Sequence, residues 1–270
     1  MRRVLLTLFF ALCSVAQAAA QGGFGVAYYD VDKFYDTIPS KFYDDKTYTP
    51  AGRMRWNSER YRRKVENTAR VIDSMAMPVV ALYGVENEAV VRDIVLATKG
   101  DYAYIHRTME SRDGLDCALL YYGDRLFPEH ITSWRGALCV ECVVDGRKMA
   151  IIVNHRCSSL GVLIAERRLH EDGRSVIVLG TPNMQNMADL GLVDHSLEAE
   201  SAGRGNLMRA TGWQMRDRIA SSWGSRVRCD VYAKRWLLDE KGRVRPTYDR
   251  QRYYGGVSAS LPIFAQFFYY

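Results

Sequence analysis

The chain has 270 residues, of which 48% are hydrophobic and 25% charged, and its formal net charge is +6. A chain of this length and composition buries a sizeable core and is expected to form one or two domains. The sequence contains no long-period repeat and no low-complexity run, which excludes a repeat array, and its mild positive charge permits phosphate-bearing partners without requiring them.

Residues 1–20 have the features of a secretory signal peptide. An arginine pair precedes the apolar run 4–12, and small residues follow, with cleavage expected near Ala18 or Ala20. The apolar run is too short to span a bilayer, and no later segment of the sequence is apolar enough to do so. The sequence therefore predicts an exported protein, periplasmic or extracellular, whose folded domain occupies residues 22–270.

Five of the six cysteines lie beyond this segment, at Cys117, Cys139, Cys142, Cys157 and Cys229. An odd number leaves at least one thiol unpaired in a monomer. Cys139 and Cys142 have the spacing of a redox or zinc pair. On a strand, however, their side chains would point to opposite faces, and no second pair completes a zinc site. We interpret the five as thiols scattered through the core.

The N-terminal part of the domain predicts a strand, a long surface loop and a helix. The strand covers Phe24–Tyr29, and a polar segment at 36–56, rich in Asp, Lys, Tyr and Pro, follows it. Apolar residues spaced three or four apart across Ser58–Met75 predict an amphipathic helix. Its other face carries four basic residues, which we expect to be solvated: Arg60, Arg62, Arg63 and Lys64.

The next segments alternate between strands and helices. Val79–Tyr83 is rich in β-branched residues and predicts a buried strand, which breaks off at Gly84 and leads into a predicted helix over Asn87–Thr98. Asp145-Gly146 predicts a type I′ hairpin turn. The remaining predicted elements are strands at Tyr102–His106, Cys117–Tyr122, Ala137–Val144 and Lys148–His155, a short helix at Gly161–His170, a strand at Ser175–Leu179, weaker strands near 207–211, 218–222 and 226–232, and a closing segment at 257–268.

Eight stretches follow one another in the order of the motifs of one superfamily. Leu82–Asn87 resembles its Leu-Gln-Glu-Val-Glu-Asn motif, and Tyr254–Ile263 resembles its closing Tyr-Gly-Gly-x-Ser-Asp-His-Leu-Pro-Val. The other six are Tyr29–Asp36, Trp56–Lys64, Gly114–Tyr121, Val153–His155, Leu179–Asn183 and Trp213–Asp217. Over nearly its whole length after residue 20, the chain resembles the secreted bacterial branch of the endonuclease/exonuclease/phosphatase superfamily.

The resemblance implies an α/β (α+β) fold, a four-layer sandwich of two mixed β-sheets flanked by helices. Active members cleave phosphodiesters or phosphomonoesters with a divalent cation, Mg²⁺ or Mn²⁺. Their chemistry needs a carboxylate that holds the ion, a carboxylate that orients or deprotonates water, and histidines that neutralise phosphoryl charge. It also makes a phosphate-containing ligand or a nucleic acid the expected partner.

Three functional positions are retained when the resemblance is carried over residue by residue. It implies that His155 contacts phosphate, that Asn183 positions substrate or water, and that Asp217 orients the first histidine or helps to bind metal. The residues alone leave a second interpretation open, in which His155 and Asp217 form a structural pair and Asn183 is a turn residue.

Five other positions depart from the family's motifs. The metal-binding Glu falls on Gly84, the water-activating Asp on Thr181, and the closing Asp-His pair on Ala259 and Ser260. Asp30 stands in place of the first-strand Asn. Losing a single group of this kind commonly costs about 10²–10³ in rate, so losing several together is expected to leave little activity.

These departures lead to the hypothesis of an exported pseudoenzyme that acts by binding. The alternative is an active Mg²⁺-dependent phosphodiesterase with a rearranged site around His155 and Asp217, whose candidate metal ligands are Asp30, Asp32 and Glu86. A third hypothesis is a structural or complex-forming protein, which an exposed apolar patch over the cleft would favour.

Overall fold

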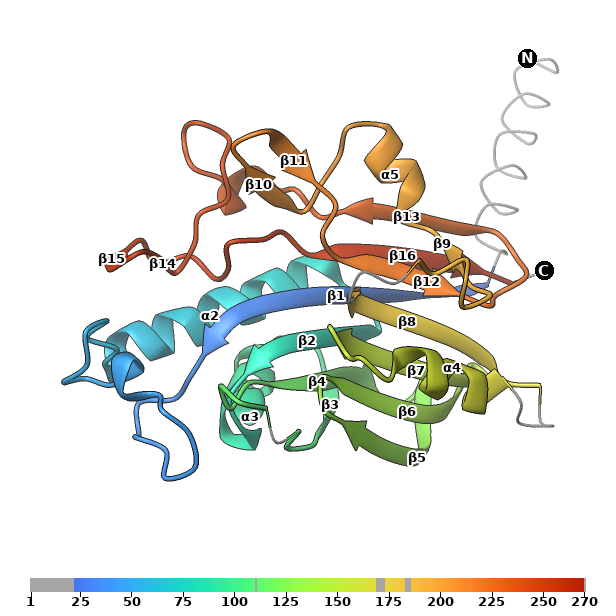
Figure 1. The fold of residues 1–270 in the computed structure, drawn as a ribbon, viewed down its shortest axis with the longest axis horizontal. Helices are drawn as coiled ribbons and strands as arrows, with labels where there is room; N and C mark the ends of the chain where they lie inside the picture. The colour runs from blue at the N-terminus through green and yellow to red at the C-terminus, as the bar shows by residue number, and fades with distance from the viewer. Residues whose placement is uncertain (1–21, 110, 169–172, 183–185, 270) are drawn as a thin grey trace, which may run out of the picture.

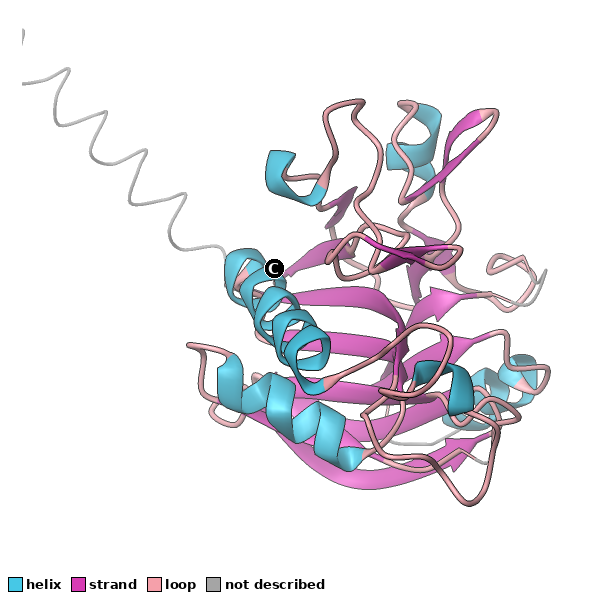
Figure 2. Cartoon of the chain, turned by 90° about the vertical axis from the view of Figure 1, so that its left-hand side faces the viewer, coloured by secondary structure: helices cyan, strands magenta, loops and turns pink. Residues whose placement is uncertain are grey.

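The computed structural model of the protein describes residues 22–109, 111–168, 173–182 and 186–269, so the predicted signal peptide at 1–20 lies outside the described residues. Two six-stranded β-sheets pack face to face, and helices cover their outer faces (Figure 1). Figure 2 shows the two longest helices side by side on one of these outer faces. The structure confirms the expected four-layer α/β sandwich of two mixed sheets.

The first sheet consists of β1 (Gly23–Phe34), β2 (Val79–Val85), β3 (Tyr102–His106), β4 (Asp116–Tyr122), β13 (Val227–Val231) and β16 (Ile263–Phe268). Its strand order is β13-β16-β1-β2-β4-β3, and all neighbours are antiparallel except β1 and β2. The helix α2 (Ser58–Met75) connects this parallel pair, because parallel strands need a long crossover. The helix α3 (Glu88–Ala97) packs against α2.

The second sheet consists of β5 (Leu126–Trp134), β6 (Ala137–Val144), β7 (Arg147–His155), β8 (Ser175–Thr181), β9 (Val193–Asp194) and β12 (Arg218–Ser221). Its strand order is β5-β6-β7-β8-β12-β9. The pair β7 and β8 is parallel and is connected by α4 (Leu160–Arg168), so each sheet has one parallel pair near its centre. The edge strand β5 was not predicted, because Pro128 and a run of exposed side chains hide its pattern.

Several short elements complete the described chain. They are η1 (Lys46–Tyr48), α5 (Leu197–Ser201), β10 (Leu207–Arg209), β11 (Gly212–Gln214), η2 (Arg235–Leu237), β14 (Tyr248–Asp249) and β15 (Arg252–Tyr253). No helix among the described residues combines the length and the apolar character that crossing a membrane requires.

The core follows from the alternation of side chains along the strands. In β1, Phe24, Val26 and Tyr28 pack between the two sheets, whereas Ala27 and Tyr29 face the layer of α2 and α3. The two faces of this strand are thus both buried, which explains its continuous apolar run. The alternation continues as far as Val31 and turns Asp30 toward the space between the sheets; it breaks at Asp32 and Lys33, where φ is positive.

The thiols lie in the core as expected. Cys142 packs between the sheets, and Cys139 packs against the layer of α4, so the two point to opposite faces of β6. All five described cysteines are buried.

The prediction that Lys64 lies on a solvated face of α2 is wrong. Its side chain is only 1% exposed, its ammonium donates to the carbonyl of Asp32, and it lies 4.8 Å from the centre of the Phe34 ring. Lys64 belongs to a row of buried residues spaced three or four apart, which continues through Thr68 and Val71. The buried face of α2 is therefore wider than its apolar residues alone indicate.

Candidate functional site

The candidate site lies where the two parallel strand pairs end. Asp30 pairs with Tyr83 at the end of the regular β1–β2 ladder, and His155 at the end of β7 pairs with Thr181 of β8. Figure 1 shows β8 running beside β1, and the two strands are in contact. Because the carboxyl ends of parallel strands collect polar groups at one edge of a sheet, the sandwich brings polar side chains from both sheets together.

Arg216 is at the centre of this site. Its Nη2 donates to Asp30 Oδ2 at 2.8 Å and to Ser260 Oγ at 3.1 Å. Its Nε and Nη2 also donate to the two carboxylate oxygens of Asp217, each at 2.8 Å. Charge-assisted, two-point bonds of this kind are among the strongest hydrogen bonds in proteins. Sequence reasoning missed Arg216, because a single arginine next to Asp217 has no distinctive pattern.

Asp217 is enclosed by donors. Its side chain is 1% exposed, Thr181 Oγ1 donates to Asp217 Oδ1 at 2.6 Å, and the Asn206 side-chain amide donates to Oδ2. The Asn206 side-chain oxygen accepts the backbone N–H groups of Arg216 and Asp217, which fixes the turn that carries both. Thr181 is therefore a neutral donor to a buried carboxylate. A second carboxylate at its position, which the resemblance would place there, would repel Asp217.

Asp30 is the second carboxylate bound by Arg216. Its Oδ1 accepts the backbone N–H of Asp32 at 2.9 Å, and the residue is 7% exposed. Burial raises the pKa of Asp30 to about 6, while the positive charge of Arg216 opposes this rise. Without Arg216, Asp30 would thus be a buried carboxyl group with little reason to ionise.

His155 is held as a neutral ring. It stacks on Tyr83 with ring centres 3.5 Å apart and an angle of 6° between the ring planes. Its Nδ1 is buried and has no hydrogen-bond partner among the described residues. Burial lowers the pKa of His155 to about 4; the charge of Asp217 works against this shift, and that of Arg216 adds to it. At neutral pH the imidazole therefore carries no positive charge for a phosphoryl oxygen.

Gly84 occupies a position that excludes an ordinary side chain. The β1–β2 and β2–β4 registers both shift here, and φ at Gly84 is +89°. A Cβ at this position would lie 3.2 Å from the backbone nitrogen of Asp32 and 3.4 Å from Asp30 Oδ1. A glutamate at position 84 would therefore need a different backbone.

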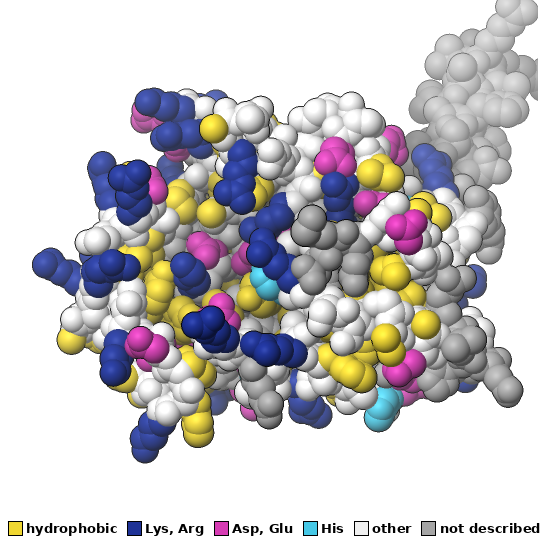
Figure 3. All heavy atoms as spheres, in the orientation of Figure 1, with side chains coloured by type: hydrophobic (Ala, Val, Ile, Leu, Met, Phe, Trp, Pro, Cys, Tyr) yellow, Lys and Arg dark blue, Asp and Glu magenta, His cyan; other side chains and the backbone are white. Residues whose placement is uncertain are grey.

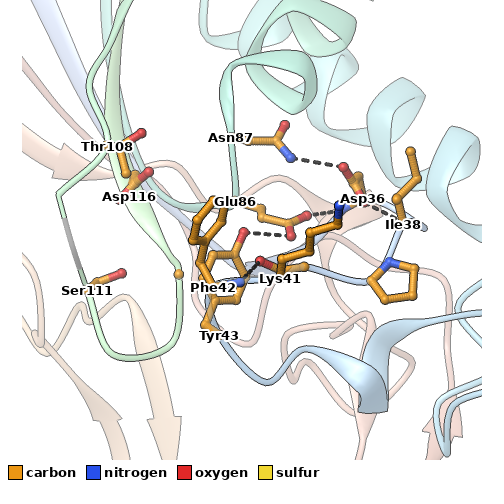
Figure 4. A pocket seen from close by; sticks show the side chains of 13 residues that line it. Asp36, Ile38, Lys41, Phe42, Tyr43, Glu86, Asn87, Thr108, Ser111 and Asp116 are labelled. Atoms are coloured by element: carbon orange, nitrogen blue, oxygen red, sulfur yellow. Dashed lines mark hydrogen bonds between the residues drawn. The ribbon is translucent and has the colours of Figure 1, made fainter.

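Glu86 lies away from this site, under the loop that follows β1. Its carboxylate accepts the hydroxyl of Tyr43 at 2.8 Å and the backbone N–H of Asp36 at 2.5 Å (Figure 4). The Asn87 side chain in turn donates to Asp36 at 2.9 Å. Burial raises the pKa of Glu86 to about 7. These residues line a separate pocket of about 690 Å³, so Glu86 anchors a loop and does not join Asp30.

The residues present do not fit a Mg²⁺ or Mn²⁺ ion. Such ions take oxygen ligands in near-octahedral geometry. Here the Arg216 guanidinium already lies between Asp30 and Asp217 and forms an ion pair with each, and Gly84 supplies no carboxylate. Among the described residues, no three His, Cys, Asp or Glu side chains are grouped so that they could share an ion. The three candidate ligands Asp30, Asp32 and Glu86 therefore do not converge.

The remaining predicted positions have different surroundings. Ser260 is buried, contacts Arg216 and lies 3.2 Å from the hydroxyl of Ser258. Ala259 is exposed and borders another pocket, together with Arg245 and other residues of the C-terminal segment. Asn183 lies outside the described residues.

A family comparison agrees with this fold. The sequence pattern that describes the Endonuclease/Exonuclease/phosphatase family matches residues 25–169, more than half of the chain. The chain belongs to this family. Among proteins with curated descriptions, none matches the sequence significantly.

Solved structures share the fold at low sequence identity. A truncated TDP2 of Caenorhabditis elegans is 14% identical with a TM-score of 0.60, and the match covers 92% of this chain and 98% of that one. A family member from Bacteroides vulgatus is 12% identical with a TM-score of 0.60, covering 91% and 98%. A mannosyl-6-phosphatase of Bacteroides thetaiotaomicron is 13% identical with a TM-score of 0.59, covering 92% and 100%. At these identities the similarity establishes the fold alone.

Proposed function

We propose that this protein is a catalytically inactive member of its family that binds a phosphate-bearing ligand at the candidate site around Arg216. The observation that carries the proposal is the ion pairing of Arg216 with Asp30 and Asp217. The paired guanidinium holds a cation in a fixed place, and its Nη1 keeps N–H donors for a ligand. Unlike a divalent metal ion, it does not lower the pKa of a bound water to generate a nucleophile.

Two arginines have donor groups left for a ligand. The bonds of Arg216 to its protein partners use Nε and Nη2, and Nη1 has no partner among the described residues. Arg156 is exposed next to His155 and makes no ion pair with a described residue. The face of the molecule in Figure 3 carries many Lys and Arg side chains around its centre. A phosphate ester has the oxygen acceptors that match such donors.

The groups that would perform hydrolysis support the same proposal. Thr181 has a hydroxyl where a base would be needed, and it is already engaged with Asp217. His155 is neutral, and Ser260 replaces a residue that carries charge. Each lost group commonly costs about 10²–10³ in rate. Hydrolysis at this site is therefore expected to be undetectable.

Hydrolysis provides the direct test. Purified protein is incubated with bis-p-nitrophenyl phosphate or plasmid DNA in the presence of Mg²⁺ or Mn²⁺, and we expect no turnover above the protein-free blank. Turnover that disappears in the His155→Ala variant would overturn the proposal and favour an active phosphodiesterase with a rearranged site. Turnover that persists in that variant would point to a contaminating enzyme.

Binding is tested with single-stranded DNA, because the structure of D. rerio TDP2 holds a single-strand DNA product. Fluorescence anisotropy with a labelled 5′-phosphorylated oligonucleotide is expected to show saturable binding that weakens about tenfold in Arg156→Gln. Arg226→Gln serves as the matched control, because Arg226 is an exposed arginine beside the end of β16, at the opposite end of the sheet from Asp30. Equal binding by both variants would contradict the assignment of ligand binding to the site around Arg216 and Arg156.

We also propose that the protein is exported and that its first 20 residues are removed. The support is the arginine pair, the short apolar run and the small residues near Ala18 and Ala20. Expression of the full chain in a bacterium with a secretory pathway, followed by mass spectrometry of the periplasmic and extracellular fractions, tests this. We expect a chain that begins shortly after Ala18 or Ala20, whereas full-length protein retained in the cytoplasm would contradict export.

A further inference from the structure

A second cluster of positive charge lies beside the end of β1 and is not used by the candidate site. Here Lys33, Lys64 and Arg250 line one pocket of about 180 Å³, which we call the Lys64 pocket. The other lining residues are Asp32, Tyr48, Met54, Thr247 and Tyr248. Three cations therefore share a small space with a single carboxylate.

Lys64 is the unusual member of this cluster. Its side chain is 1% exposed, yet no carboxylate of the described residues forms an ion pair with it. An ammonium has three N–H donors, and the described residues provide one acceptor, the carbonyl of Asp32. The rings of Phe34 and Trp56, at 4.8 Å and 6.0 Å, face the ammonium but accept no conventional hydrogen bond. A buried cation with so few partners has unused capacity for an anion.

The other two cations are also unpaired. Lys33 is exposed, lies 6.0 Å from the centre of the Tyr48 ring and makes no ion pair among the described residues. Arg250 is exposed at the turn between β14 and β15, again without a described carboxylate partner. Both residues have positive φ, +48° at Lys33 and +54° at Arg250. Figure 3 shows many Lys and Arg side chains on the left of this face, where Figure 1 places α2 and the β14–β15 hairpin.

We infer that the Lys64 pocket binds a single tetrahedral oxyanion, a phosphate or sulfate group. Lys64 forms its floor, and Lys33 and Arg250 approach from its rim. The size favours one such group over a whole nucleotide, because a water molecule takes about 30 Å³ in the liquid and the pocket holds only a few. The three cations Lys33, Lys64 and Arg250 outnumber the two carboxylates whose charge reaches Lys64, those of Asp32 and Asp30, so an anion is attracted.

The ligand group has two sources, the free inorganic ion and the phosphoryl group of an ester. Isothermal titration calorimetry with inorganic phosphate, with sulfate and with phenyl phosphate separates them. We expect saturable binding of at least one of these anions to the full protein. Tighter binding of phenyl phosphate would assign the pocket to an ester, and tighter binding of the inorganic ions would assign it to the free anion.

Substitutions then locate the site. Lys64→Met keeps the length and the apolar stem of the side chain but removes the charge, and we expect the anion affinity to fall about tenfold or more. The double variant Lys33→Gln/Arg250→Gln changes only exposed side chains, so it tests the pocket even if Lys64→Met does not fold. Arg62→Gln, an exposed arginine on the same helix, is the matched control and should bind as the original protein does.

Arg156→Gln distinguishes this inference from the proposed function. An anion bound in the Lys64 pocket keeps its affinity in Arg156→Gln. An anion bound at the candidate site around Arg216 loses affinity in this variant. A loss of affinity in Arg156→Gln with full binding in the Lys33→Gln/Arg250→Gln variant would overturn the inference and leave the proposed function intact. Absence of anion binding to the original protein would also overturn it. In a crystal soaked with tungstate, the anomalous signal should lie within hydrogen-bond reach of Lys64 Nζ.

Discussion

At the scale of single residues, Arg216 determines how the buried charges of the site are paired. Its side chain is 22% exposed and forms ion pairs with one carboxylate that is 9% exposed and another that is 1% exposed. Removing one partner of a buried ion pair leaves an uncompensated charge, and the cost is about 3–5 kcal/mol. We therefore expect Arg216→Met to lower the free energy of unfolding by about 3 kcal/mol, as measured by urea denaturation.

The comparison for this variant is Arg209→Met, which removes an arginine that is exposed on β10 and forms no ion pair with a described residue. Its stability should stay within about 0.5 kcal/mol of the original protein. If Arg216→Met were as stable as Arg209→Met, the ion pairs of Arg216 would contribute nothing measurable to the free energy of unfolding.

His155 makes stability depend on pH. Its folded pKa of about 4 lies below its ordinary value of 6.5, so protonation favours the unfolded chain. The contribution of neutral His155 is complete above pH 6.5 and is lost as the pH falls from 6.5 toward 4. Between pH 7 and pH 4.5, the original protein should lose on the order of 2–3 kcal/mol more stability than His155→Gln.

Unfolding curves of both proteins across this pH range measure the difference. Asp30 and Glu86 have raised pKa values and oppose the trend in both proteins, so they largely cancel in the comparison. Parallel pH profiles for the original protein and His155→Gln would show that the imidazole is not held neutral by its surroundings.

At the scale of the element, the end of β2 explains why this site differs from the family's site. Both ladders shift register at Gly84, and its φ of +89° is one that L-residues rarely adopt. Placing a Cβ in this conformation costs about 1–2 kcal/mol before any contact with Asp32 is counted. We therefore expect Gly84→Ala to destabilise the protein by at least about 1 kcal/mol in thermal or urea unfolding.

Gly123→Ala provides the comparison, because an added Cβ there would meet no atom within 4 Å. It should change stability by only a few tenths of a kcal/mol. Gly84→Glu is expected to behave like Gly84→Ala and to show no metal-dependent hydrolysis. Activity in Gly84→Glu alone would mean that the bulge is more adaptable than its register indicates.

The residue ranges of the two long helices were predictable from their local sequences. The helices α2 and α3 are capped by Asn57 and Asn87, the residues just before them, whose side chains accept backbone N–H groups of the first turn. Such caps and the apolar spacing that follows are local, so the helix ranges were predictable. The burial of Lys64 was not, because the lysine extends the buried row of α2 only where it meets the Asp32 carbonyl.

At the scale of the whole molecule, the fixed guanidinium predicts that the thermal stability of the protein does not depend on divalent metal ions. An ion present at a hundred times its dissociation constant would stabilise the fold by about 2.7 kcal/mol, which corresponds to several degrees in Tm. Because Arg216 lies between Asp30 and Asp217, we expect Tm to be the same in millimolar Mg²⁺, in Mn²⁺ and after treatment with EDTA.

Differential scanning calorimetry measures this comparison. Ca²⁺ at the same ionic strength controls for general salt effects. A rise in Tm of several degrees with Mg²⁺ or Mn²⁺, absent with Ca²⁺, would reveal a metal site and would favour the alternative of an active phosphodiesterase.

Local patterns in the sequence were enough to predict the layers of this protein and its family. Strand alternation, helix spacing and the ordered motifs depend on neighbouring residues, so they predicted the sandwich and the positions that lost their expected residues. The chemical consequences of those losses follow from contacts that form only in the folded chain. Arg216 meets Asp30 across 186 residues of chain, and Gly84 takes a positive φ where two ladders shift register. Lys64 lies buried beside β1 and forms no ion pair with a carboxylate of the described residues. Each of these depends on charge and space between segments distant in the sequence, which no local pattern records.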